Sequence, residues 1–209
     1  MSALNTKRVA LGLKLALWLG ALAPGVWLVR GLVLGDLGPN PIEKLTLVTG
    51  MTALVLLLVT LAVSPLRRMT GWNALIRLRR PLGLFAFFYA ACHFSVWFVF
   101  DMVFNWRWMI EDVAERPYIT VGFAAFVLMI PLAVTSTKGW IRRLGKRWVT
   151  LHRLVYLVTG LGVLHYYWVV KADTRLPFLF GAIWAVLLLA RIPAARWWAR
   201  RRSAERIAS

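Results

Sequence analysis

The sequence contains three histidines, His93, His152 and His165, and each lies inside a long apolar segment. An ionisable side chain inside a membrane span is costly and usually functional. For one such residue, a neutral imidazole hydrogen-bonded between helices is the ordinary alternative. Because all three lie on the third and fifth apolar segments, we favour imidazoles that hold haem iron between helices.

The depth of each histidine in its span indicates which two share an iron. At a rise of about 1.5 Å per residue, His93 lies about 18 Å from the start of its span at Pro81. In the span that starts at Trp148, His152 lies about 6 Å in and His165 about 25 Å in. We therefore predict that His93 and His165 are the axial pair of one b-type haem in the outer half of the membrane, with His152 near the cytoplasmic face.

His152 has no histidine partner on the third span. It is separated from His165 by about 140° around an ideal helix, so the two share a face only if the stretch 159–162, with its two glycines, is distorted. Otherwise they serve different ligands. His152 would then bind a second haem with a non-histidine ligand, contact a haem propionate, or line a flavin site beside basic side chains suited to phosphate. These side chains are Arg77, Arg79, Arg80 and Arg147.

The composition excludes a soluble protein. Of 209 residues, 60% are hydrophobic, which leaves too little polar surface to cover a core. The net charge of +18 would otherwise suggest nucleic-acid binding, but the basic residues lie in short runs between apolar segments, so we expect no nucleic-acid partner. The single cysteine, Cys92, excludes an intramolecular disulfide and multi-cysteine metal sites.

Apolar runs of about 20 residues, the length that crosses a hydrocarbon core of about 30 Å, predict six transmembrane helices. They cover residues 9–29, 45–63, 81–100, 118–134, 148–170 and 177–192. The first run is long and lacks a small-residue cleavage site before Arg30, which predicts a retained helix rather than a signal peptide. The sequence thus predicts an all-α integral membrane bundle that forms a single domain over residues 1–209.

The positions of lysine and arginine predict the orientation, because basic residues in short loops stay in the cytoplasm. Eighteen lie on one side: Lys7, Arg8, Arg67, Arg68, Arg77, Arg79, Arg80, Lys138, Arg142, Arg143, Lys146, Arg147, Arg191, Arg196, Arg200, Arg201, Arg202 and Arg206. Six lie on the other: Arg30, Lys44, Arg107, Arg116, Lys171 and Arg175. Both termini are therefore predicted to be cytoplasmic, and the arginines are expected to contact membrane lipid headgroups as well.

Motifs around the histidines carry a family resemblance. They are Thr49-Gly50, residues 60–67, Arg79-Arg80-Pro81-Leu82-Gly83-Leu84, residues 116–120, Thr135-Ser136-Thr137, residues 144–157 around His152, and His165-Tyr166. In these stretches the sequence resembles the MsrQ family, the haem-binding membrane subunits of bacterial periplasmic methionine sulfoxide reductase systems. That family is a small member of the ferric-reductase-like transmembrane group.

The resemblance implies a path for electrons across the inner membrane. Such proteins take electrons on the cytoplasmic or quinone side and pass them through b haem, with FMN as a further cofactor, to the periplasmic molybdopterin reductase MsrP. The larger relatives carry two histidines on each of two helices and an attached flavin domain. Here the third span has only His93, and we expect no dinucleotide-binding domain after the sixth span. We therefore expect the donor to be a membrane quinol or a separate cytosolic flavin reductase.

Other functions stay open at this point. Within the same chemistry, the alternatives are a cytochrome b subunit of another oxidoreductase or a stand-alone ferric reductase. From another class, the alternative is a cofactor-free transporter or assembly factor. Recognition of a periplasmic partner is expected to rest on loops such as residues 101–116, which contain no decisive motif.

Overall fold

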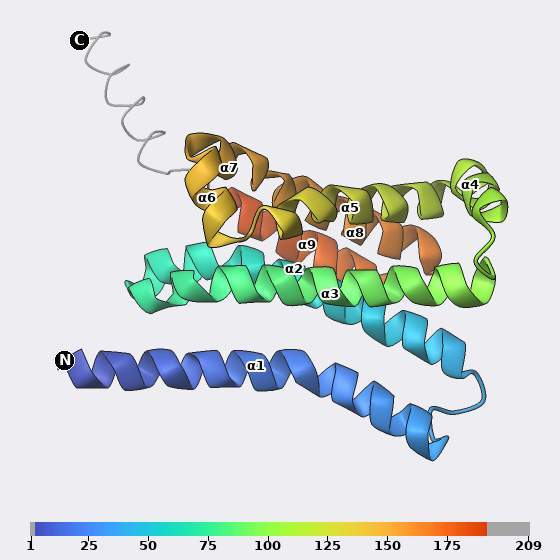
Figure 1. The fold of residues 1–209 in the computed structure, drawn as a ribbon, viewed down its shortest axis with the longest axis horizontal. Coiled ribbons are helices and arrows are strands. Elements are labelled where there is room, and N and C mark those ends of the chain that lie inside the picture. Colours follow the sequence, from blue (N-terminus) through green and yellow to red (C-terminus); the bar gives the residue numbers. More distant parts are fainter. Residues whose placement is uncertain (1–2, 192–209) are drawn as a thin grey trace, which may run out of the picture.

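The computed structural model describes the backbone of residues 3–191 and the side chains of residues 11–191 (Figure 1). This part of the chain is helical, without a strand, in agreement with the predicted all-α class. The elements are α1 (Ala3–Leu34), α2 (Pro41–Thr70), the 3-10 helix η1 (Asn73–Leu78), α3 (Arg79–Val96), the π-helix η2 (Trp97–Asp101), α4 (Trp106–Glu115), α5 (Pro117–Val134), α6 (Lys138–Leu144), α7 (Lys146–Leu151), α8 (Leu154–Val169) and α9 (Arg175–Leu189). Ile192 and the five predicted cytoplasmic arginines that follow it, Arg196, Arg200, Arg201, Arg202 and Arg206, lie outside the described residues.

All six predicted spans overlap helices. Four helical stretches of the described chain are long and apolar enough to cross a membrane by length and composition: Leu11–Leu34, Pro41–Thr70, Asn73–Asp101 and Pro117–Val134. The other two predicted spans fall on α8 and α9, which have 16 and 15 residues and are shorter than the usual span of about 20. The count of six spans stays a prediction.

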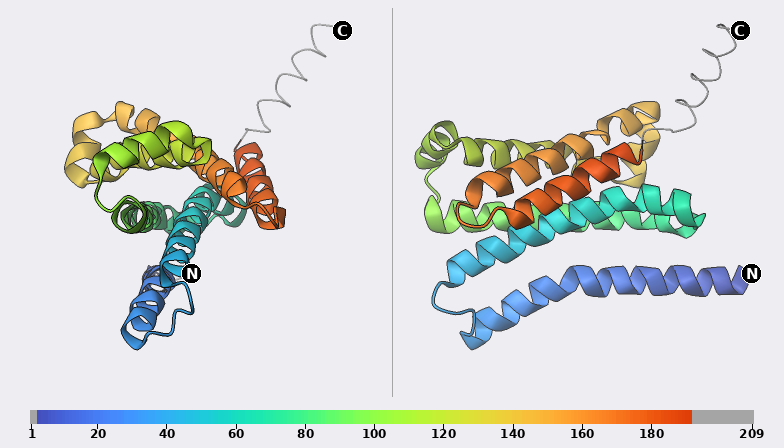
Figure 2. Two further views of the ribbon diagram at one scale, coloured as in Figure 1. Left: turned by 90° about the vertical axis from the view of Figure 1, so that its right-hand side faces the viewer. Right: turned by 180° about the vertical axis from the view of Figure 1, so that it is seen from behind.

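The helices run roughly along one axis (Figure 1). In the bundle, α2 packs along α3, and α5 packs along α8, while α1 lies at the outer edge beside α2 (Figure 2). The core between these helices is apolar and includes the fully buried Leu61, Ala86 and Val158. The start of α1 lies at the same end of the molecule as α6 and α7, and α4 lies at the opposite end (Figure 1).

A bend divides α1 where a side chain from α3 enters its hydrogen-bond ladder (Figure 1). The Tyr89 hydroxyl accepts from the Gly25 amide at 2.9 Å and donates to the Ala21 carbonyl at 2.7 Å, so it replaces the direct bond between those two residues. Pro24, beside this point, also lacks an amide hydrogen. Insertion into the ladder and an internal proline are the usual causes of a kink.

The stretch 101–116, which the sequence indicated to be a loop, contains the helix α4 instead. The Asn105 side chain caps α4 by accepting from the Arg107 and Trp108 amides. At the other end, the nearly buried Asp112 carboxylate pairs with Arg116 at 2.9 Å, directly before α5 begins. The cap and this ion pair explain why a short polar segment is helical here.

The irregularity of the fifth predicted span lies at His152 rather than at the glycines. The chain breaks between α7, which ends at Leu151, and α8, which begins at Leu154. Gly160 and Gly162 lie inside the continuous helix α8. A Cβ added at Gly160 would stand 2.7 Å from the Trp184 ring, so this glycine serves close packing between α8 and α9. Of the two alternatives, a distortion at 159–162 is therefore not the one found in the structure.

Candidate metal centre

His93 on α3 and His165 on α8 face each other inside the bundle. Their ring centroids lie 6.1 Å apart, and the ring planes cross at 78°. A metal bond of about 2 Å to each imidazole and about 1.1 Å from nitrogen to ring centre place the centres of two axial imidazoles about 6 Å apart. The observed separation is therefore that of two rings with room for one metal ion between them.

Each of the two rings is held through the same nitrogen. His93 Nδ1 lies 3.0 Å from the Thr46 carbonyl oxygen on α2, and His165 Nδ1 lies 2.7 Å from the Tyr118 carbonyl oxygen on α5. A carbonyl can only accept, so both Nδ1 atoms carry the proton and donate it. The lone pair of each neutral imidazole is then on Nε2, which is the arrangement found in metal-ligating histidines.

The ligand count favours a metal that already has other ligands. Among the described residues, no group of three or more His, Cys, Asp and Glu side chains is placed to hold a metal ion. A bare ion such as zinc takes four ligands, of which protein side chains supply three or four. Two histidines suffice for haem iron, whose remaining positions are taken by the porphyrin. The residues present therefore fit haem.

An aromatic cluster between α3 and α5 starts at Phe94, the residue that follows His93. The Phe94 ring, directly after His93, stacks on Phe126 of α5 with centroids 4.8 Å apart, and Phe123 lies 6.1 Å from it. Such an apolar surrounding suits a flat hydrophobic cofactor and limits the access of water.

His152 is held differently, at the end of the bundle formed by α6 and α7. Its Nε2 lies 3.1 Å from Thr135 Oγ1, and its ring stacks on Trp148 with centroids 4.0 Å apart. Thr135 Oγ1 donates its own hydrogen to the Pro131 carbonyl at 2.6 Å, so it accepts from His152 Nε2–H. The nitrogen that is free in the other two histidines is therefore occupied here.

The four arginines expected near His152 are placed unequally. Arg79, at the start of α3, is half-buried and lies within electrostatic range of His152. The other three, Arg77, Arg80 and Arg147, are exposed. Of the predicted set, only Arg79 is thus brought to His152.

The Arg191 side chain lies inside the bundle. From the sequence, this residue counted only as one of the basic residues that predict the membrane orientation. Its Nη1 donates to the Tyr156 hydroxyl at 2.8 Å, its Nη2 donates to the Leu61 carbonyl, and the guanidinium lies 4.8 Å from the centre of the Tyr156 ring. Arg68 and Arg79 are within electrostatic range of it. Sequence reasoning could have found this residue from its place directly after an apolar helix, where a charge needs internal partners.

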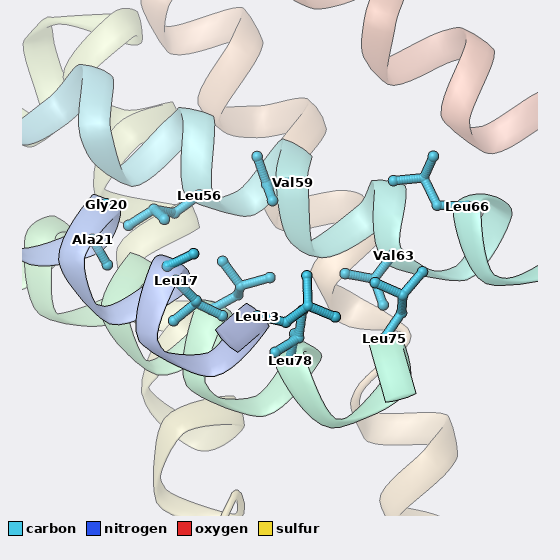
Figure 3. A pocket seen from close by; sticks show the side chains of 12 residues that line it. Leu13, Leu17, Gly20, Ala21, Leu56, Val59, Val63, Leu66, Leu75 and Leu78 are labelled. Atoms are coloured by element: carbon cyan, nitrogen blue, oxygen red, sulfur yellow. The ribbon is translucent and has the colours of Figure 1, made fainter. Parts of the chain in front are cut away.

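An apolar cavity of about 330 Å³ lies apart from the histidines, between α1, α2 and the η1–α3 segment (Figure 3). Its wall is made of side chains such as Leu17, Leu56, Val59 and Leu78 (Figure 3). None of the lining residues carries a group that binds metal, so the cavity is not part of the metal centre.

The chain is similar to a known family and to several known proteins. The family model described as "Ferric reductase like transmembrane component" matches residues 49–163, which include His93 and His152. A protein-methionine-sulfoxide reductase heme-binding subunit MsrQ from Herminiimonas arsenicoxydans is 54% identical over 86% of this chain and 84% of its own length. The proteins of the same name from Ralstonia nicotianae and Caulobacter vibrioides are 51% and 46% identical over 88% and 90% of the chain, and over 85% and 88% of their own lengths.

No solved structure matches the chain. The family match spans more than half of the sequence, and the similarity to the curated relatives runs over most of both chains. The chain therefore belongs to the ferric-reductase-like transmembrane family and, within it, to the MsrQ group.

Proposed function

We propose that the chain is a membrane electron-transfer subunit in which His93 and His165 hold one b-type haem in the outer half of the bacterial inner membrane. The observation that carries this proposal is the pair of facing imidazoles with protonated Nδ1 atoms and ring centroids 6.1 Å apart. The names of the relatives, which are heme-binding subunits of protein-methionine-sulfoxide reductases, support it. Haem held there would supply one-electron reduction and oxidation.

The residues around the pair have defined tasks in this proposal. The Thr46 and Tyr118 carbonyls orient the rings and keep their tautomers fixed. The aromatic cluster around Phe94 excludes water from the centre. The protein thus contributes position and surroundings, while the cofactor contributes the chemistry.

Electrons are proposed to arrive from the cytoplasmic side. The start of α1, the turn between α2 and α3, and the helices α6 and α7 gather at one end of the molecule (Figure 1). Their segments carry most of the basic residues, which supports a cytoplasmic location of this end and of both termini. His152, directly after α7, and Arg79, the first residue of α3 after the turn, belong to these segments. They are the described side chains best suited to a cytoplasmic-side cofactor such as FMN.

Several finer assignments come from the resemblance. We propose that the donor is a membrane quinol or a cytosolic flavin reductase. The acceptor is proposed to be the periplasmic molybdopterin reductase MsrP, which repairs oxidised methionines. The helix α4, with the exposed side chains of Trp106, Trp108 and Ile110, lies at the end of the molecule away from α6 and α7 and is available for this partner.

A second candidate function is a ferric reductase, because the matching family model is described by that activity. Both functions need the same haem, and they differ in the acceptor. Electron delivery to a purified periplasmic methionine sulfoxide reductase, compared with delivery to a ferric chelate, separates them.

The proposal is tested by a reduced-minus-oxidised visible spectrum of the purified chain, with haem iron and flavin measured per polypeptide in the same preparation. We expect a b-type spectrum and one haem per polypeptide held by the histidine pair. A preparation that is assembled but shows no b-type spectrum would contradict the proposal.

A further inference from the structure

The contacts of His93 and His165 repeat with one fixed spacing. Each Nδ1 bonds to a carbonyl 47 residues earlier in the chain, at Thr46 and at Tyr118. Each ring also lies against a glycine four residues after that carbonyl, Gly50 for His93 and Gly122 for His165. The carbonyl residue, the glycine and the histidine of the second group, Tyr118, Gly122 and His165, each follow their counterparts in the first group by 72 residues.

The packing around these residues repeats with the same offset. In the first unit α2 packs on α3, and in the second α5 packs on α8. Buried residues of the first unit, Ala53, Leu57 and Ala86, correspond to buried residues of the second, Ala125, Met129 and Val158. A short helix precedes the histidine-bearing helix in both units, η1 before α3 and α7 before α8. The metal centre is therefore built from two copies of one helix pair.

The glycine in each unit has a physical reason. A helical carbonyl also accepts from the amide four residues later, and the side chain of that later residue covers the turn before it. With glycine at this position no Cβ stands between the carbonyl and the imidazole, so the ring reaches the carbonyl oxygen. At Thr46 the Thr49 hydroxyl also lies 3.2 Å from this oxygen. A Cβ at Gly50 would stand 2.9 Å from Nδ1 and Cε1 of His93. A Cβ at Gly122 would stand 2.7 Å from Nδ1 and 2.8 Å from Cε1 of His165.

We propose that Gly50 and Gly122 are positioning residues for the metal centre, each a seat against which one imidazole is held while its Nδ1–H bonds to the carbonyl one turn earlier. This inference rests on the proposed function, since it takes the two histidines as the axial pair. A side chain at either glycine displaces the ring from its carbonyl. The displaced ring then no longer presents Nε2 to the shared metal.

Matched variants test the seats in the purified full-length chain. Gly50→Ala and Gly122→Ala each add one methyl group against a histidine ring. Gly160→Ala is the control for tight packing, because its Cβ would stand 2.7 Å from the Trp184 ring and touches no histidine. Gly83→Ala is the control for substitution in a helix, since nothing lies within 4 Å of its Cβ. Haem per polypeptide, carbon monoxide difference spectra and helical circular dichroism are measured for all four.

We expect Gly122→Ala to lower haem affinity about tenfold or more, as the loss of an outer partner of a metal ligand commonly does. Haem that remains bound should bind carbon monoxide, because a displaced imidazole opens one axial position. Gly50→Ala should change in the same direction and by less, because its contact is looser. Gly160→Ala and Gly83→Ala should keep the low-spin spectrum and reject carbon monoxide.

Three results would overturn the proposal. The first is wild-type haem content with no carbon monoxide binding in both seat variants. The second is an equal loss in Gly160→Ala. The third is loss of the assembled bundle in the seat variants, because an intact bundle with a displaced ring is expected. If His93→Ala and His165→Ala keep their haem in the same series, the axial pair itself fails. If His93→Ala and His165→Ala lose their haem while Gly50→Ala and Gly122→Ala match the wild type, the axial pair stands and only the role of the two glycines is refuted.

Discussion

Two histidines on one stretch of chain, His152 and His165, have opposite surroundings. The His165 ring faces His93 and donates from Nδ1 to a backbone carbonyl, so the Nε2 lone pair is not used by that bond. The His152 ring uses Nε2 to bond Thr135 and lies flat on Trp148. Both residues are histidines in one predicted membrane span, so residue type and membership of the span do not separate them. The ring nitrogen that the protein occupies decides which nitrogen of an intramembrane histidine is left as a ligand: Nε2 in His165 and Nδ1 in His152.

The largest expected effect comes from removing either member of the facing pair. His93→Ala and His165→Ala should each abolish the low-spin haem spectrum, because one axial imidazole alone does not give a bis-histidine site. The measurement is haem per polypeptide and the reduced-minus-oxidised spectrum of each purified variant. Retention of the full spectrum in either variant would show that the pairing is wrong.

A smaller and different effect is expected at the other end of the molecule. His152→Ala should leave the spectrum of the outer haem largely intact and slow its reduction by a cytoplasmic donor, because this side chain lies beside Arg79 at the proposed uptake side. Stopped-flow reduction followed by dithionite measures both quantities in one experiment. Complete loss of haem would instead make His152 part of the main site, and a normal rate would make it structural.

The smallest effect should follow from changing the partner of His152. Thr135→Val keeps the shape of the side chain and removes the hydroxyl, so the free energy of unfolding should fall by about 1 kcal/mol. The outer haem spectrum should not change, because Thr135 lies at the opposite end of α5 from Tyr118, whose carbonyl bonds to His165. Thermal unfolding and the visible spectrum are the measurements. A spectral shift comparable to that of His165→Ala would remove the distinction between the two regions.

Much of the fold was predictable because apolar runs and turn residues are local signals. The run 118–134, for example, agrees with α5 to within one residue at its start. The helix α4 was missed because its stability comes from the Asn105 cap and the ion pair between Asp112 and Arg116, which are weaker signals than an apolar run.

The candidate site was predictable only in part. Residue counting gives depth along a helix, and it suggested that His93 and His165 lie near one level. It does not give the direction in which a ring points, so the hydrogen bond from His152 Nε2 to Thr135 could not be predicted from the sequence. Gly50 and Gly122 were missed because their role depends on a carbonyl that lies 47 residues before each histidine. The equal spacing in the two units was the signal that could have found them.

The most direct test of the central claim is the electron paramagnetic resonance spectrum of the oxidised, purified chain at low temperature. The two imidazole planes cross at 78°, and haem iron held between rings in this arrangement would have two nearly equal orbital energies in the directions of the rings. We therefore expect a single low-spin haem with one strongly anisotropic signal, which is lost in His93→Ala and in His165→Ala. A high-spin signal, or a rhombic low-spin signal that persists in both variants, would contradict the assignment of His93 and His165 as the axial pair.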